Sequence, residues 1–241
     1  MAMVSVDEPA NTRERLLEAA IKLLASNGPE GLQARKVASE IGASTMAVYT
    51  HFGGMPQLTE AIVREGFRRL DQQLSTVEPT RDPVADLFAL GLAYRAHALD
   101  NPQLYRLMFG LSMPLPRRGT RRNLLTAAGV PTDLAEGQTA FQHLVTALTR
   151  VIDSGRTRKE DPKRAAAQVW SAIHGYVLLE IAGFFGRDGR GVEQVLQPLG
   201  ISLAVGLGDT VRAATRSARA VQRRAVTFQG EGQPGNTTPR R

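Results

Sequence analysis

The stretch RKVASEIGASTMAVYTHF, residues 35–52, decides how the start of this chain folds. In a helix-turn-helix, two helices cross so closely that the contact needs a small residue. The turn needs a residue that tolerates positive φ, and the second helix must bury an aliphatic side chain. Ala38, Gly42 and Val48 meet these requirements at offsets of four and six residues. Further apolar positions extend the same buried surface: Val37, Ile41 and Phe52.

Helical patterns flank this motif on both sides, and no segment has the alternation of a strand. Asn11 followed by Glu14 is typical of a helix capping pair, and Gly28-Pro29 ends the helical spacing that follows. A longer helix is expected from Pro56 to about residue 76. The later helices are expected over 82–100, 102–110, 132–154, 162–185 and 191–225. The sequence therefore predicts an all-α fold of about nine helices.

The composition indicates a globular chain in a reducing compartment. Hydrophobic residues make up 42% of the 241 residues, enough for a sizeable core. With no cysteine, disulfides and sulfur-ligated metal sites are excluded, and the cytoplasm is the expected location. No cationic segment followed by an apolar run marks a signal peptide. The longest apolar tract, residues 165–185, carries Gln168, His174 and Glu180, so we interpret it as a buried core helix rather than a membrane span.

Neither a catalytic centre nor a metal site is evident in the sequence. The four histidines, at positions 51, 97, 143 and 174, lack the spacing of metal ligands. No glycine-rich phosphate loop follows a strand, and no pair of carboxylates brackets a candidate pocket residue. We therefore expect no enzymatic activity and no cofactor.

The charge is distributed unevenly along the chain. The formal net charge is +7, yet residues 1–75 hold 8 Lys and Arg against 9 Asp and Glu, whereas residues 212–241 hold 7 against 1. The helix-turn-helix is therefore not basic overall, and any nucleic-acid reading there must depend on short polar side chains. A rival hypothesis is a sequence-neutral DNA-coating protein that uses the C-terminal arginines and binds with steep salt dependence.

The ordered motifs from Asn11 to about Leu74 resemble the DNA-binding domain of the tetracycline-repressor (TetR) family. The residues that carry this resemblance are Leu-Leu-Glu-Ala-Ala (16–20), Asn27-Gly28, Arg35-Lys36-Val37-Ala38, Gly42-Ala43-Ser44, Tyr49-Thr50-His51-Phe52 and Leu58. Further on, Asn101-Pro102, residues 105–110 and WSAIHGYVLLE (170–180) resemble, more loosely, the ligand-and-dimer domain of the WHG-motif branch. Together the two resemblances cover most of residues 11–210.

The resemblance implies a homodimeric DNA-binding regulator: a repressor released from a pseudo-palindromic operator by a small hydrophobic ligand, with a ligand-dependent activator as the alternative. It divides the chain into an N-terminal arm (1–10), the helix-turn-helix domain (11–54), a connecting fourth helix (55–78), a ligand-binding and dimerisation domain (79–225) and a disordered basic tail (226–241). Two positions depart from the family pattern. Gln33 replaces the hydroxyl residue that usually caps the second helix, and Met55 replaces a lysine that would contact a phosphate.

Carried over residue by residue, the resemblance and the local chemistry predict a DNA-contacting set: Arg35, Lys36, Ser44, Thr45, Met46, Tyr49, Thr50 and His51. Ser44 could equally be the N-cap of the third helix, and these two roles are compatible. Tyr49 and His51 are expected to contact phosphates, with simple packing as the alternative. Thr45, Met46 and Thr50 are expected to reach base edges.

In the ligand-binding and dimerisation domain, called the body below, aromatic and methionine residues predict the walls of a ligand cavity: Phe88, Leu92, Tyr105, Met108, Phe109, Phe141, Leu144 and His174. Acidic residues are scarce on these segments, so we expect a neutral or anionic hydrophobic ligand. Helical spacing predicts a dimer interface at Trp170, Ile173, Val177, Ile181, Leu203, Gly206 and Leu207. For both sets the alternative is that the side chains simply fill the core. His174 could be a structural hydrogen-bonding residue, and Trp170 fits the pocket and the interface equally well.

Overall fold

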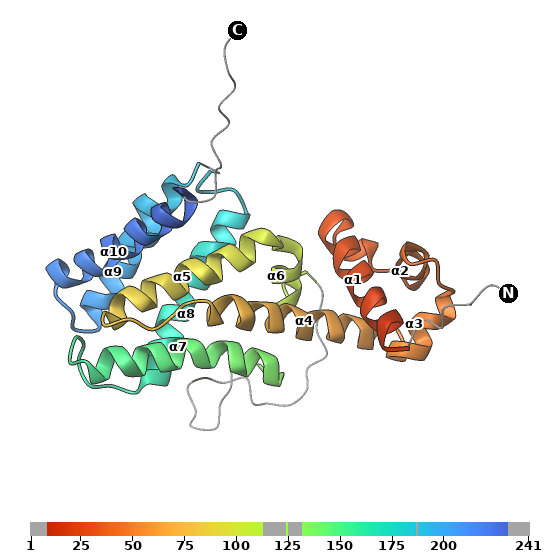
Figure 1. The fold of residues 1–241 in the computed structure, drawn as a ribbon, viewed down its shortest axis with the longest axis horizontal. Helices are drawn as coiled ribbons and strands as arrows, with labels where there is room; N and C mark the ends of the chain where they lie inside the picture. Colours follow the sequence, from red (N-terminus) through yellow and green to blue (C-terminus); the bar gives the residue numbers. More distant parts are fainter. Residues whose placement is uncertain (1–8, 113–123, 125–131, 187, 231–241) are drawn as a thin grey trace, which may run out of the picture. The chain divides into compact units, whose positions relative to one another are not determined.

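The structure is a computed structural model that describes residues 9–112, 124, 132–186 and 188–230, and all regular secondary structure in these ranges is helical (Figure 1). The predicted all-α fold is confirmed. The chain divides into two compact units: unit 1 comprises Met1–Gln73 and Ala96–Ala140, and unit 2 comprises Leu74–Arg95 and Phe141–Arg241. Residues 1–8 of the predicted arm and 231–241 of the predicted tail lie outside the described residues.

Unit 1 begins with the three helices of the predicted helix-turn-helix domain (11–54), called the head below, and a single 3-10 turn, η1. Its elements are α1 (Pro9–Asn27), η1 (Pro29–Gly31), α2 (Ala34–Glu40), α3 (Thr45–Phe52), most of α4 (Met55–Ser75) and α6 (Pro102–Met108). It also holds the last residues of α5 (Pro83–Asp100) and the first of α7 (Ala135–Asp153). Helices α4, α5 and α7 are therefore each shared by the two units.

Unit 2 contains most of α5 and α7 together with the C-terminal helices. These are α8 (Pro162–Ile181), the π-helical turn η2 (Val192–Leu196), α9 (Gln197–Gly206) and α10 (Val211–Gly230). Asp161 caps α8 through its carboxylate, which accepts a hydrogen bond from the Lys163 backbone N–H, and Pro162 occupies the first helical position. Of the predicted basic tail, residues 226–230 belong to α10.

The predicted single helix over 191–225 is wrong, because the chain breaks after α9. Gly208 has φ 117°, which an L side chain rarely adopts, and a Cβ there would lie 2.8 Å from the backbone nitrogen of Arg158. That nitrogen donates to the carbonyl of Leu207, so the loop before α8 holds the break. The described residues consequently contain ten α-helices rather than about nine.

The core of unit 1 joins α6 to α1 and α4. Tyr105 and Leu107 are fully buried, and α6 packs against α1. Met108 lies against Gly66 of α4, where a Cβ would approach the Met108 sulfur to 2.7 Å. The Phe67 ring meets the Phe109 ring edge-on at 5.7 Å between centroids. Gly66 therefore lets α6 approach α4 closely, and these aromatic and methionine side chains form core contacts.

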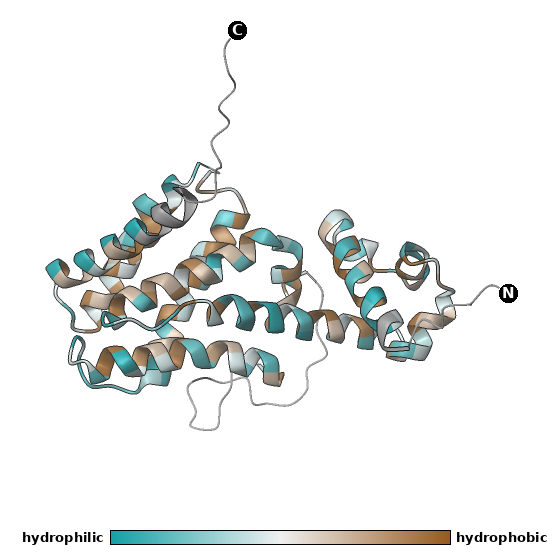
Figure 2. Ribbon diagram, in the orientation of Figure 1, coloured by the Kyte–Doolittle hydropathy of each residue, from teal (hydrophilic) through white to brown (hydrophobic). Residues whose placement is uncertain are grey.

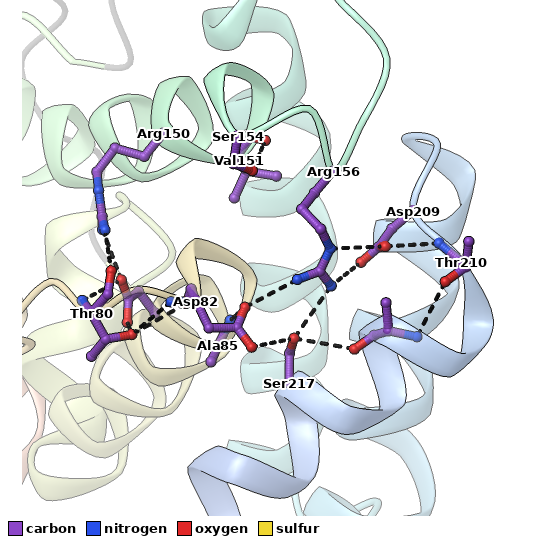
Figure 3. Close-up of polar contacts among 12 residues, drawn as sticks. Thr80, Asp82, Ala85, Arg150, Val151, Ser154, Arg156, Asp209, Thr210 and Ser217 are labelled. Carbon is purple, nitrogen blue, oxygen red and sulfur yellow. Dashed lines mark hydrogen bonds and ion pairs between the residues drawn. The ribbon is translucent and has the colours of Figure 1, made fainter.

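Two carboxylate–arginine networks in unit 2 connect segments that are distant in the sequence (Figure 3). Arg156, in the loop after α7, donates to both oxygens of Asp209 at 3.1 and 2.5 Å and to Asp82 at 3.2 Å. Ser217 of α10 donates to the second oxygen of Asp82 at 2.7 Å. Asp209 is almost completely buried, with a side chain only 3% exposed. The contact with Asp209 raises the pKa of Arg156, as expected for a cation held beside a carboxylate.

A second network holds the start of α5 against α7. Arg150 donates to the buried carboxylate of Asp86 at 2.8 Å and to the carbonyl of Thr80 at 2.7 Å. Burial by itself raises the pKa of Asp86, but hydrogen bonds from Thr80 and Arg150 outweigh it, so the net pKa is lowered. Asp86 therefore remains charged within the folded unit.

Hydropathy differs along and between the helices. Hydrophilic residues gather in the second half of α4, whereas α5 is mostly apolar (Figure 2). Among the helices that the structure describes, none combines the length and the hydropathy needed to cross a bilayer.

We expect Arg156→Met to destabilise unit 2 by about 3 kcal/mol, because it would leave the buried Asp209 carboxylate without its cation. Urea unfolding followed by circular dichroism measures this change. The matched control is Arg190→Met, since Arg190 pairs with Asp188 on the exposed surface and its loss should leave the unfolding midpoint unchanged. Equal effects of the two replacements would show that the buried network does not stabilise the fold.

His97 makes unit 1 sensitive to acid. Burial lowers the pKa of His97 to about 4, against about 6.5 for an unfolded histidine. Between pH 6.5 and 4 the unfolded chain therefore binds one more proton at this residue, and the free energy of unfolding should fall by up to about 3 kcal/mol as the pH drops. Urea unfolding of the His97→Gln variant at pH 7, 5.5 and 4 tests this. The free energy of unfolding of the parent minus that of the variant should fall by up to about 3 kcal/mol from pH 7 to pH 4, and a constant difference would contradict the prediction.

Candidate nucleic-acid interface

Helices α2 and α3 form the helix-turn-helix that residues 35–52 predict. Val37, Ala38 and Val48 are buried, with Val37 and Val48 fully inaccessible. Gly42 takes φ 70° in the turn. The turn is closed by the backbone N–H of Ala43, which donates to the carbonyl of Ala38 at 2.9 Å. Each requirement that the spacing imposed is thus met by the residue expected for it.

Helix α1 braces this pair from the other side. It packs against both α2 and α3. The Arg15 guanidinium donates to the carbonyl of Ile41, the residue that ends α2, at 3.3 Å. The guanidinium carbon of Arg13 lies 4.8 Å from the centre of the Phe52 ring at the end of α3, a cation–π contact. Arg13 itself is exposed, so it places a positive charge beside the C-terminal end of α3.

The outward side of α3 presents most of the predicted DNA-contacting set. Met46 and Tyr49 are 67% and 51% exposed, which is unusual for side chains of their size. Seven of the eight predicted residues are exposed, and His51 is half-buried: Arg35, Lys36, Ser44, Thr45, Met46, Tyr49, Thr50 and His51. One side of the helix therefore lies in the core. The other side exposes hydroxyl groups, the Tyr49 phenol and the Met46 thioether to solvent.

The two predicted caps differ from the usual pattern. Ser44 occupies the N-cap position of α3, but its hydroxyl makes no capping hydrogen bond. Gln33 occupies the N-cap of α2, also without a side-chain cap, and its amide donates to the carbonyl of Glu30 instead. The Ser44 hydroxyl is thus not engaged by its own helix and can donate to a phosphate or a base.

This arrangement suits double-stranded DNA. An α-helix fits the major groove, where hydroxyl groups can hydrogen-bond to base edges and a methionine or threonine methyl can contact thymine. Arg35 and Lys36, exposed on α2, can attract phosphates on the flanking backbone. Arg13 adds a charge that the sequence pattern missed. No local signal marks it, because its contact with Phe52 joins residues far apart in the chain.

The residues predicted to line one ligand cavity belong to both units. Tyr105 and Met108 lie in the core of unit 1, and the partly buried Phe109 packs against Tyr105. In unit 2, Phe88 and Leu92 line a cavity, whereas Phe141 and Leu144 pack against a buried cluster around Leu148. Of the eight residues predicted to line one cavity, Phe88 and Leu92 line this one. Residues of α9 and α10, which were not in the predicted set, form other parts of its wall.

The aromatic cluster around His174 is a hydrogen-bonded part of unit 2. The Tyr94 hydroxyl lies 3.0 Å from His174 Nδ1, and the Trp170 indole N–H donates to the same hydroxyl at 3.2 Å. Burial lowers the pKa of His174. The Trp170 ring also meets Phe141 edge-on at 6.0 Å between centroids. Both Trp170 and His174 are thus engaged within the chain and are not among the residues that line the cavity.

Several members of the predicted dimer interface are interior residues of a single chain. Val177 is fully buried, and Ile173 and Leu207 are buried and line the cavity with Leu203. Val177 has no exposed area in one chain and so cannot contact a second copy, whereas Ile173 and Leu207, 8% and 3% exposed, could contribute little area to an interface. Gly206 is exposed, Trp170 and Ile181 are partly exposed, and Leu179 and Phe184 nearby are large exposed apolar residues.

Metal chemistry has no support in the described part of the chain, which contains no group of three or more His, Cys, Asp or Glu able to hold an ion.

Comparison with known proteins agrees with this geometry. Residues 16–62 match the family described as bacterial regulatory proteins, tetR family, and residues 87–199 match the tetracyclin repressor-like C-terminal domain. An uncharacterised HTH-type transcriptional regulator of Mycobacterium tuberculosis is 25% identical over 207 residues, covering 86% of each chain.

Two further relatives differ in how much of the chain they match. The HTH-type transcriptional repressor AcnR of Corynebacterium efficiens is 33% identical over 75 residues, 31% of this chain and 40% of AcnR. A solved structure of a protein of unknown function from Rhodococcus sp. RHA1 is 25% identical, with a TM-score of 0.68, and the match covers 86% of this chain and 100% of that one. The chain therefore belongs to the TetR family of DNA-binding transcriptional regulators.

Proposed function

We propose that this protein is a repressor that binds a pseudo-palindromic operator as a homodimer and is released from it by a small hydrophobic ligand. The observation that carries the DNA-binding part is the two-sided character of α3. Val48 and Phe52 anchor the helix in the core, while Thr45, Tyr49 and Thr50 face solvent on the other side. A helix held in this way presents its polar side chains in a constant geometry, which reading of base edges requires.

Repression rather than activation is supported by the function of a relative. AcnR, whose similarity extends over 75 residues, is a repressor. In this proposal residues 11–54 read DNA, the fourth helix (55–78) connects, and residues 79–225 sense and dimerise. The proposal assigns the chain no catalytic role and places it in the cytoplasm, where bacterial chromosomal DNA lies.

Dimerisation is proposed through the C-terminal end of α8. Leu179 is 45% and Phe184 is 74% exposed, and Ile181 between them is partly exposed. Exposed apolar groups of this size in one area favour a protein partner. A two-fold dimer would place the two α3 helices at half-sites about 34–36 Å apart, or a multiple of this distance.

Release by ligand would be a population shift. A ligand that binds one conformation of the body more tightly favours that conformation and alters the spacing of the two heads. Changing the DNA-competent fraction from 99% to 1% requires about 10⁴-fold tighter binding to the incompetent state. Helices α4, α5 and α7 are each shared by both units, so a displacement of these helices in unit 2 extends along the same helix into unit 1.

We expect Thr45→Ala to change base preference and Tyr49→Phe to weaken binding generally. Loss of a base-edge contact should cost about 1–3 kcal/mol at one base pair, whereas loss of a phosphate contact should lower affinity about equally on all operator variants. Fluorescence anisotropy with the protein's own promoter, its single-base variants and random DNA measures both effects.

The same titration separates the repressor from the sequence-neutral alternative. That alternative rests on the exposed arginines of α10, Arg212, Arg216 and Arg219. Equal affinity for promoter and random DNA, together with loss of binding on replacement of these arginines by Gln, would favour the coating protein. If Thr45→Ala weakens every sequence equally, Thr45 is not a base reader.

We expect the double variant Leu179→Glu/Phe184→Ser to be monomeric and to lose operator affinity, because a single head engages only one half-site. Size-exclusion chromatography with light scattering gives the oligomeric state. Leu111→Ser, at a residue 53% exposed in unit 1, is the matched control and should remain dimeric. A double variant that stays dimeric would place the interface on another surface.

A further inference from the structure

Unit 2 contains a partly open cavity of about 90 Å³ that is lined by α5, α8, η2, α9 and α10. It differs from the cavity that the sequence predicted, because its walls include the two C-terminal helices. It is smaller than the roughly 150 Å³ apolar cavity that accommodates benzene in a well-studied engineered protein. A slim molecule of a few carbon atoms therefore fits it without rearrangement.

The cavity results from a missing side chain on α5. Leu87, Phe88, Gly91 and Leu92 recur at spacings of one, three and four residues and line the cavity from one helix face. At Gly91, no heavy atom apart from its own helix and chain neighbours lies within 4 Å of where a Cβ would stand. By contrast, a Cβ at Gly200 on α9 would lie 2.5 Å from the Phe88 ring, so that glycine is filled by its neighbour. The space beside Gly91 stays open.

The walls carry a single polar feature. All described residues that line the cavity are apolar except Gln197 and Gln222, and none of them is charged. The Gln222 amide N–H donates to the Gln197 carbonyl oxygen at 2.7 Å. Each amide has further capacity after this bond: Gln197 keeps its NH₂ group and Gln222 keeps its carbonyl oxygen. The pair thus offers both N–H donors and a carbonyl acceptor side by side.

We propose that this cavity binds an uncharged, mainly apolar molecule with one hydroxyl or carbonyl group, which hydrogen-bonds to the Gln197–Gln222 pair. The inference rests on the proposed function, since this molecule would be the effector that releases DNA. It narrows the neutral or anionic ligand expected from the sequence to a neutral one. An anion in this cavity would lose its hydration without meeting a cation, which is strongly unfavourable.

Three probes with the same carbon chain test the charge rule: 1-butanol, butanoate and butylammonium. Ligand-observed NMR with the full chain should show binding of 1-butanol in the millimolar range, as expected for so few atoms, and no binding of the two ions. Butanoate or butylammonium that binds as well as the alcohol would overturn the proposal, as would absence of any 1-butanol binding.

Gly91→Leu locates the binding. The leucine should fill the open space, raise the melting temperature because glycine is a poor helix former, and abolish the 1-butanol signal. The matched control is Gly175→Leu on α8, which also has nothing within 4 Å of its Cβ position but does not line the cavity. This control should bind 1-butanol like the parent. Binding that survives in Gly91→Leu would place the alcohol elsewhere and overturn the proposal.

The polar pair is tested by Gln197→Met/Gln222→Met, which retains side-chain length and removes the hydrogen bonds. It should weaken 1-butanol about five- to tenfold, the usual net effect of one hydrogen bond, and leave binding of cyclobutane unchanged. Equal losses for both molecules would show that the pair only supports the fold and does not hold the hydroxyl group.

Operator release is measured separately, by fluorescence anisotropy with the promoter fragment at the same 1-butanol concentrations. Release by the alcohol in the parent but not in Gly91→Leu supports both the cavity and the switch. Binding by NMR without release leaves the cavity assignment intact and contradicts ligand-controlled repression. Release that persists in Gly91→Leu contradicts the cavity as the sensing site and leaves the regulator intact.

Discussion

The burial of Val48 and Phe52 against α1 and α2 is the contact on which the DNA-reading surface depends. Helix α3 has only eight residues, and isolated helices of this length are not stable in water. The packing of its buried side therefore fixes the position of α3, and this also fixes the positions of the polar side chains on the opposite side. The contact of Arg13 with the Phe52 ring and the bond from Arg15 to the end of α2 strengthen the same junction. A surface with little net charge can read DNA in this way because short side chains are held in place.

Unit 2 combines networks of ion pairs and hydrogen bonds with an apolar core that contains unfilled space. Around Arg156, the carboxylates of Asp82 and Asp209 connect the loop after α7 with the starts of α5 and α10, and loss of Arg156 would leave the buried Asp209 without a cation. On α5, however, Gly91 leaves open space where an aliphatic side chain would both fill the core and improve the helix. Such a loss of stability is typical of positions kept for function. Rigid connections around one open space are what a ligand-responsive unit requires.

The helical class and the helix-turn-helix could be predicted from local patterns alone. These depend on local chemistry: a small residue at Ala38, a turn at Gly42 and a buried aliphatic at Val48, all within a short stretch. The exposure of the predicted DNA-contacting residues follows for the same reason, since helical periodicity separates the buried side of α3 from its outer side. The caps at Asn101 and Asp161 are equally local, because each needs only its own first helical turn.

Which apolar helix faces meet, and what lies between them, became clear from the folded chain. Periodicity shows that a face is apolar, but a cavity wall, a core and a dimer interface have the same pattern. The sequence therefore could not show that Met108 packs on α4 or that Ile173 lines a cavity. It also missed the break at Gly208, which the distant Arg158 holds, and the pairing of Gln197 with Gln222 across two helices. These features were decided by contacts between residues far apart in the chain, which no local pattern records.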